Sequence, residues 1–173
     1  INAVMRIIFA ISAFLVVVLA STDGHAQQKG LIDVFGDWSA FAIKEAGQPV
    51  CYIGSEPGKQ QGDYKKRGDT YMLVTLRPSD KKSSGIVSLT AGYSFKKGRD
   101  VIATIGKDAF KMFTKNGSAW TYKDSDDDAM VAAMKRGVEL VVKGTSSRGT
   151  ETTDTYSLKG FTAAHKTALE ACK

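Results

Sequence analysis

Short β-rich runs separated by turn residues recur through most of the chain, and they limit the possible folds more than any other feature. In one run, Val138, Leu140 and Val142 alternate with Glu139 and Lys143, as expected for a strand with one buried face. The chain is 43% hydrophobic, which is enough to form a core and excludes a disordered chain. The predicted strands are 38–44, 50–55, 71–77, 86–93, 101–105, 109–114, 118–122, 138–144 and 152–158.

Turn and helix signals complete the expected architecture. Asn116-Gly117 predicts a two-residue hairpin, because both residues tolerate the positive φ of a type I′ turn. Ser125, followed by three aspartates, predicts a helix N-cap, and Gly137 is expected to end that helix. Apolar residues at spacings of three and four predict a second helix over 162–171. The expected fold class is all-β, an antiparallel β-sandwich with two short peripheral helices, and a partly closed barrel is the alternative.

Residues 1–26 are predicted to be a secretory signal peptide. Arg6 precedes an apolar run over 7–20 that is too short to span a bilayer comfortably, and small residues suit cleavage between Ala26 and Gln27. An uncleaved N-terminal anchor is the alternative. The predicted leader holds one basic and one acidic residue, so the single domain expected over 27–173 keeps the net charge of +6.

Export would place the two cysteines, Cys51 and Cys172, in an oxidising compartment. Because no other cysteine is present, a disulfide between them is the favoured interpretation, and two buried free thiols are the alternative. No Cys-x-x-Cys motif occurs, so the usual sequence of a thiol oxidoreductase is missing.

The sequence shows no set of residues with the arrangement of a catalytic centre. His165 is the one histidine in the domain, and it follows the apolar face of the predicted second helix, where a packed side chain is expected. The Gly-x-Ser-x-Gly motif is absent. We therefore predict no catalytic residues and no enzyme. The alternative is an envelope hydrolase or transferase that works through carboxylates such as Glu45, Glu56 or Glu139, which need not be close in sequence.

Metal and phosphate motifs are incomplete. Asp124, Asp126 and Asp128 match the start of a calcium loop, but the glycine and the glutamate that should follow are missing, and helix capping explains these acids. One histidine and two distant cysteines do not make a zinc site. The segment 144–150 faintly resembles a phosphate loop but lacks its lysine, so it is interpreted as a loop between strands. We expect no metal and no cofactor.

A basic segment is the candidate binding loop. Tyr64, Lys65, Lys66 and Arg67 place an aromatic ring among cations, a combination that suits an anionic glycan, a lipid headgroup or nucleic acid. Export disfavours nucleic acid. Because acidic residues lie beside the cations, ordinary solvated turns are the alternative interpretation. Two further basic turns are 81–82 and 96–99.

Several segments, taken together, are similar to those of a known family. They are Phe35-Gly36-Asp37-Trp38, Arg77-Pro78, Ala91-Gly92-Tyr93, the stretches 143–149 and 154–164, and Cys172. Over nearly all of the domain they resemble the invasion-associated locus B family. Many members carry a further cysteine a few residues after Gly-Asp-Trp, where this chain has none, so the fuller cysteine pattern of the family does not carry over.

The resemblance implies a compartment and a fold more than a chemistry. These are exported proteins of alphaproteobacteria with an immunoglobulin-like β-sandwich, named for members linked to host-cell invasion, with no defined ligand or enzymatic activity. We therefore expect an interaction module that is periplasmic, outer-membrane-associated or secreted and that contributes to virulence or envelope integrity. Its expected partner is an envelope or host-surface component. A factor for outer-membrane assembly or stress is the alternative.

Overall fold

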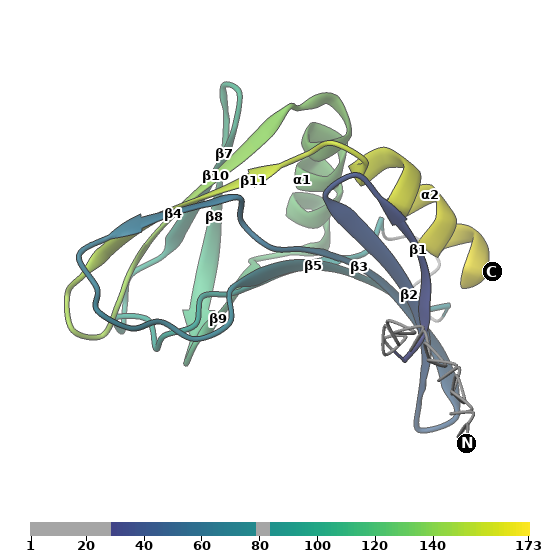
Figure 1. Ribbon diagram of the computed structural model, residues 1–173, viewed down its shortest axis with the longest axis horizontal. Coiled ribbons are helices and arrows are strands. Elements are labelled where there is room, and N and C mark those ends of the chain that lie inside the picture. The colour runs from purple at the N-terminus through teal and green to yellow at the C-terminus, as the bar shows by residue number, and fades with distance from the viewer. Residues whose placement is uncertain (1–28, 79–83) are drawn as a thin grey trace, which may run out of the picture.

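Eleven antiparallel strands form one sheet in the computed structural model, which describes residues 29–78 and 84–173. The predicted cleavage site at Ala26 and Gln27 and the basic turn 81–82 lie outside the described residues. The sheet order is β1-β2-β3-β5-β6-β9-β8-β7-β10-β11-β4 (Figure 1). The strands are β1 (Leu31–Phe35), β2 (Trp38–Glu45), β3 (Gln48–Ser55), β4 (Lys59–Gly62), β5 (Tyr71–Leu76), β6 (Ile86–Thr90), β7 (Val101–Ile105), β8 (Asp108–Lys115), β9 (Ser118–Thr121), β10 (Glu139–Thr145) and β11 (Glu151–Ser157).

The sheet curls over on itself. β4 begins soon after β3 ends, yet it pairs with β11 at the far edge of the sheet, so the two edges must approach each other. Trp38 spans the interior, since its indole N–H donates to the carbonyl of Ser157 on β11 at 2.9 Å. In Figure 1, β10 and β11 run above β3 and β5. The layers of the expected sandwich are thus two halves of one bent sheet.

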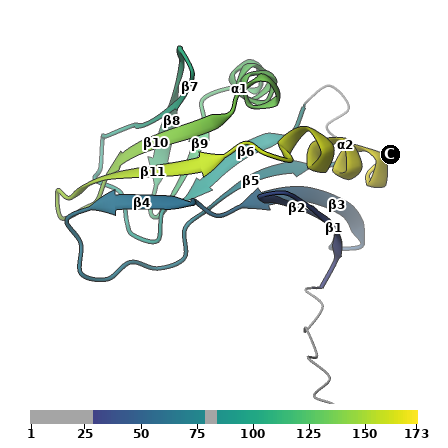
Figure 2. The same ribbon diagram turned by 45° about the horizontal axis from the view of Figure 1, so that its top comes forward.

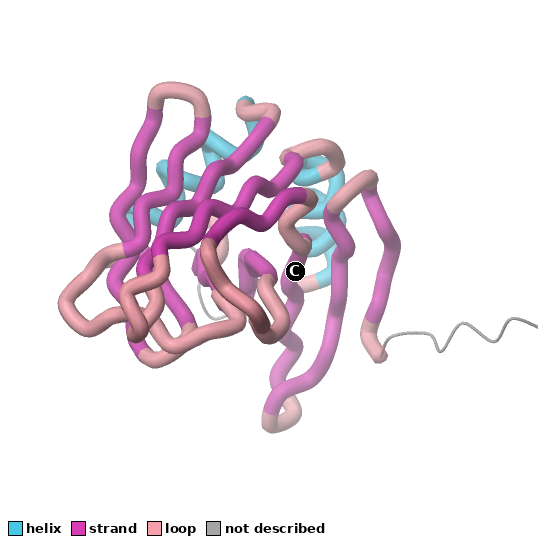
Figure 3. Tube along the Cα trace, turned by 60° about the vertical axis from the view of Figure 1, so that its left-hand side comes forward, coloured by secondary structure: helices cyan, strands magenta, loops and turns pink. Residues whose placement is uncertain are grey.

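Two helices complete the fold, α1 (Asp124–Arg136) and α2 (Phe161–Ala171). α1 lies against β6, β8 and β9, and α2 lies against β1, β2, β3 and β5. The all-β class, the antiparallel pairing and the C-terminal helix agree with the sequence-based prediction, and strands dominate the view in Figure 3. Within the described residues, no helix combines the length and hydrophobicity needed to cross a bilayer.

Most strands coincide with the predicted runs, and the exceptions have local causes. Val138 is 86% exposed and precedes β10, so its expected place on the buried face was wrong, whereas Leu140 and Val142 are buried. The predicted strand 86–93 ends at Thr90, because Gly92 turns the chain with a φ of 70°. β1 and β4 were not predicted, and both are edge strands.

Helix α1 starts differently from the prediction. Its N-cap is Lys123, whose side chain makes no capping hydrogen bond, so the expected N-cap Ser125 lies within the first turn. The carboxylate of Asp127 is buried and accepts the backbone N–H of Val87 at 2.8 Å. Asp128 likewise accepts the N–H of Ser84 at 2.8 Å. These acids therefore fasten the helix to the segment before and within β6.

Two of the segments that carry the family resemblance pack against each other. The rings of Trp38 and Phe161 meet edge to face, with centroids 4.9 Å apart, and both side chains are fully buried. Gly160 adopts a φ of 92° beside the turn between β1 and β2, where a Cβ would overlap the carbonyl oxygen of Phe35. These segments form a structural joint between α2 and the start of the sheet.

Gly160→Ala should lower the free energy of unfolding by roughly 2 kcal/mol or more, because it adds both backbone strain and the overlap with Phe35. Gly149→Ala is a matched control, since Gly149 has a φ of 90° and nothing within 4 Å of the added Cβ. It should cost about 1 kcal/mol. Urea denaturation measures both values, and equal losses would show that the close contact with Phe35 is unimportant.

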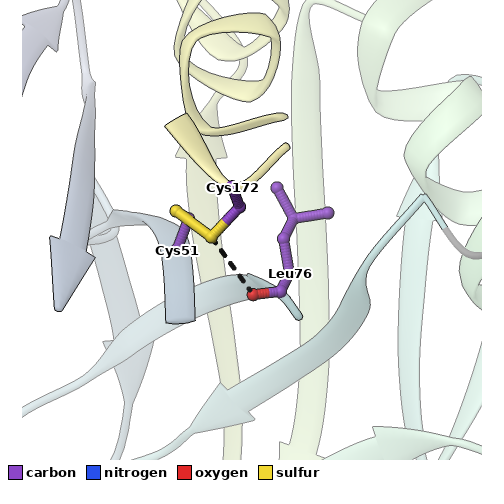
Figure 4. Close-up of a disulfide and its surroundings, with 3 residues drawn as sticks. All are labelled: Cys51, Leu76 and Cys172. Carbon is purple, nitrogen blue, oxygen red and sulfur yellow. Dashed lines mark hydrogen bonds between the residues drawn. A yellow bond between two sulfur atoms is a disulfide. The ribbon is translucent and has the colours of Figure 1, made fainter. Parts of the chain in front are cut away.

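Helix α2 is anchored at both ends of its buried face. His165 is 1% exposed, stacks on Phe161, and donates from Nε2 to the carbonyl of Ser84 at 2.7 Å. Near the other end, Cys172 forms a disulfide with Cys51 of β3, and its Sγ lies 4.0 Å from the carbonyl of Leu76 (Figure 4). The expected pairing of the two cysteines is therefore present.

Burial of His165 makes stability depend on pH. Desolvation lowers the pKa of His165 below its usual 6.5, and the nearby charge of Lys135 lowers it further. Well above pH 6.5 the imidazole is neutral in both the folded and unfolded states. As pH falls below that value, the unfolded chain takes up the proton first, so the free energy of unfolding should decrease. His165→Gln keeps a donor for Ser84 and should flatten this decrease between about pH 7 and 5 in urea titrations. If the free energy of unfolding fell equally with pH in the wild-type protein and in His165→Gln, the prediction would be contradicted.

Candidate functional site

The predicted binding loop lies at a pocket. The connection between β4 and β5 carries Tyr64, Lys65 and Lys66, and it faces the hairpin loop between β10 and β11, which carries Ser147 and Arg148. The volume of the hollow is about 530 Å³, within the range of small-molecule sites. We call this hollow the basic-loop pocket.

Strand pairing brings the two loops together. β4 pairs with β11 in antiparallel register, with Gly62 opposite Thr152, so the chain leaving β4 lies beside the hairpin loop that precedes β11 (Figure 2). The other end of the loop is held where Gly68 donates its N–H to the carbonyl of Gly92 at 2.9 Å. A Cβ on Gly92 would overlap the carbonyl oxygen of Gly68, so this close approach needs glycine.

Arg67 belongs to the floor of the pocket and not to its free cations. Its side chain is 4% exposed, and its two terminal nitrogens each donate to a carboxylate oxygen of Asp154 at 2.6 Å. Nε donates to the carbonyl of Ala91 at 2.7 Å. Burial alone would lower the pKa of Arg67, but hydrogen bonding to Asp154 and the charge of that carboxylate raise it overall. The guanidinium therefore stays charged, and Asp154 neutralises it.

Two tyrosines pack on this buried cation. The guanidinium carbon of Arg67 lies 5.4 Å from the ring centroid of Tyr64 and 5.0 Å from that of Tyr93. The hydroxyl of Tyr93 is 2.6 Å from that of Thr152, and burial raises the pKa of Tyr93. The pocket wall is thus fixed by neighbouring side chains before any ligand arrives.

The free positive charge of the pocket comes from Lys65, Lys66 and Arg148. All three are exposed, and none forms an ion pair within the part of the chain that the structure describes. Hydroxyl groups of Ser94 and Ser147 line the same hollow. Cations beside hydroxyl donors can bind phosphate, sulfate or carboxylate groups.

The other residues singled out in the sequence do not join this pocket. Glu45 is paired with Arg77 at 3.3 Å, Glu56 lines a separate cleft, and Glu139 lies beside the end of α1. His165 is packed in the core. The basic turn 96–99 is exposed and does not line the pocket.

Arg148, Ser94 and Ser147 were not predicted as binding residues from the sequence. The segment 144–150 is the loop between strands that was expected, and it also contributes a wall of the pocket. Its Gly, Ser and Arg content was a signal of anion binding, but nothing in the local sequence placed it opposite the basic loop.

Comparisons with known proteins agree with the fold. Residues 38–169 match the family model described as "Invasion associated locus B (IalB) protein". Among solved structures, the chain is similar to the crystal structure of invasion associated protein B from Bartonella henselae, with a TM-score of 0.55 and 19% identity. That similarity covers 80% of this chain and 94% of the other, and at this identity it concerns the fold alone. No curated protein sequence matches the chain.

Proposed function

Because the chain belongs to the invasion associated locus B family, we propose that it is an exported, non-enzymatic interaction module that binds an anionic partner through the basic-loop pocket. The partner is an envelope or host-surface component that presents phosphate or carboxylate groups. Exposed cations attract such groups over several ångströms, and a preformed hollow selects among them by shape.

One observation carries the proposal. Lys65, Lys66 and Arg148 come from loops far apart in sequence and line one hollow, where they outnumber the lining carboxylate of Asp63 and form no ion pair among the described residues. Like charges placed close together repel each other, so they do not stabilise the fold unless an anion lies between them. The basic turn 96–99, by contrast, does not line this pocket.

The buried pair beneath the pocket supports the same function. A neutralised Arg67 contributes packing for Tyr64 and Tyr93 while leaving the free cations above it to meet the ligand. A rigid wall reduces the conformational entropy that binding would otherwise cost. The module is therefore suited to a ligand that needs no large rearrangement.

The test is a binding titration with two anionic probes. The purified, disulfide-bonded protein is titrated with inorganic pyrophosphate and, separately, with vesicles containing phosphatidylglycerol. The variant Lys65→Ala/Lys66→Ala/Arg148→Ala should weaken binding by about tenfold or more, equivalent to about 1.4 kcal/mol. The matched control, Lys96→Ala/Lys97→Ala/Arg99→Ala, removes the same charge outside the pocket and should change affinity much less.

The two probes separate a soluble anion from a membrane surface. If the wild-type protein binds pyrophosphate and the pocket variant loses that binding, the ligand is a small anion. If the protein binds only the vesicles, the ligand is a lipid headgroup at a membrane surface. In both cases affinity should fall as salt is added. Equal losses in the pocket variant and the control would reject the pocket and favour a diffuse effect of net charge.

A further inference from the structure

A second cleft lies on the outer face of β2, β3 and β5. Alternation along the strands turns Ile53 and Met72 into the core and places Phe41, Tyr52 and Tyr71 on the opposite face. The hollow beside these rings has a volume of about 840 Å³ and shares no lining residue with the basic-loop pocket. We call it the aromatic cleft.

Three aromatic side chains make the cleft partly apolar. Phe41 and Tyr52 are direct partners across β2 and β3, and their rings stack with centroids 4.7 Å apart and planes 11° apart. Tyr71, on β5, is 36% exposed. The face of an aromatic ring carries negative charge, so it attracts the weakly positive C–H groups of an apolar ligand face.

Several polar side chains line the cleft beside these rings and have no hydrogen-bond partner within the described residues. The carboxylates of Asp37 and Glu56 and the hydroxyls of Ser39, Tyr52 and Tyr71 make no side-chain hydrogen bond within the described residues. Carboxylates accept hydrogen bonds, and hydroxyls both donate and accept them. A ligand with an apolar ring face and a rim of hydroxyl groups would satisfy both parts of the cleft.

Charge narrows the class of ligand further. Asp37 and Glu56 outnumber the single cation of the cleft, Lys29, so a phosphate or carboxylate group would be repelled there. We propose that the aromatic cleft binds a neutral oligosaccharide, with pyranose rings stacked on Phe41, Tyr52 or Tyr71 and their hydroxyls bound to the surrounding polar groups. This site is independent of the anionic ligand proposed above.

The experiment follows amide chemical shifts of the isotopically labelled protein during titration with cellotetraose and with chitotetraose at millimolar concentration. Shift changes should concentrate on β2, β3 and β5. Tyr71→Ala should weaken binding by about tenfold. Tyr122→Ala removes another exposed tyrosine, 57% exposed and outside the cleft, and should leave affinity unchanged.

Two further arms make the ligand class testable. Asp37→Asn/Glu56→Gln keeps hydrogen-bonding groups but removes both charges, so binding of a neutral saccharide should fall by less than about tenfold. A tetra-arginine peptide tests a cationic ligand, and tighter binding of that peptide than of either saccharide would overturn the proposal. It would also be overturned if neither saccharide bound, or if Tyr71→Ala and Tyr122→Ala weakened binding equally.

The same variants distinguish a failure of the saccharide proposal from a failure of the proposed anion site. The proposal for the aromatic cleft would be overturned if saccharide binding disappeared in Lys65→Ala/Lys66→Ala/Arg148→Ala but not in Tyr71→Ala. The sugar would then be assigned to the basic-loop pocket. Saccharide binding retained in that triple variant and lost in Tyr71→Ala supports the aromatic cleft, whatever the result with pyrophosphate.

Discussion

Replacing both bridged cysteines, as Cys51→Ala/Cys172→Ala, should lower the free energy of unfolding by about 4 to 5 kcal/mol. The two residues are 121 positions apart, so the bridge removes a large loop entropy from the unfolded chain. In the folded chain it also holds the end of α2 on β3. Guanidinium denaturation of the oxidised protein and of the double variant measures the loss.

Reduction of the wild-type disulfide provides an independent control, and it should give a loss similar to that of the double variant. Amide hydrogen exchange should rise most in α2, because the helix would then depend on Trp38, Phe161 and His165 for its position. A loss below about 1 kcal/mol would mean that the unfolded chain retains contacts that already restrict this loop.

Local patterns were sufficient to predict most strands, because alternating burial leaves its mark on each strand separately. β4 shows where this information ends. Its sequence, Lys-Gln-Gln-Gly, is polar and exposed at every position, so it carries no hydrophobic pattern. It is a strand because β11 offers an open edge to it, and that edge comes within reach of β4 only once the sheet has curled.

The candidate site was predicted in part for a related reason. Tyr64, Lys65 and Lys66 are neighbours in sequence, so their grouping was visible, but Arg148 reaches them only through the pairing of β4 with β11. The role of Arg67 was also hidden, because its partner Asp154 is 87 positions away. A cation that is buried and neutralised cannot be told from an exposed one by its local sequence.

The segments that suggested the family have mainly structural roles. Gly36 and Gly160 allow the turn before β2 to pack on the start of α2, and Gly92 closes on Gly68. Tyr93 packs on Arg67 beneath the basic-loop pocket. The resemblance therefore rests largely on residues of the scaffold, although the stretch 143–149 also contains Arg148 of the proposed anion site, which lies on an exposed loop as Lys65 does.

Breaking the Arg67–Asp154 pair should also have a large effect. Arg67→Met leaves the carboxylate of Asp154, 2% exposed, without its partner, and should cost about 3 to 5 kcal/mol of unfolding free energy. Asp154→Leu should cost a similar amount, because it leaves the buried guanidinium of Arg67 without its partner. Lys66→Met is the matched control, since it removes a neighbouring exposed cation and should change stability by no more than about 0.5 kcal/mol.

The double variant Arg67→Met/Asp154→Leu distinguishes the pair from its parts. Two apolar side chains leave no uncompensated charge, so its loss should be well below the sum of the two single losses. Chemical denaturation of the four proteins completes the cycle, and additive losses would show that the two side chains stabilise the fold independently. Because Arg67 also packs on Tyr64 and Tyr93, its single variants should disturb the pocket wall as well. Tests of ligand binding should therefore use substitutions of Lys65, Lys66 and Arg148, because these leave the buried Arg67–Asp154 pair intact.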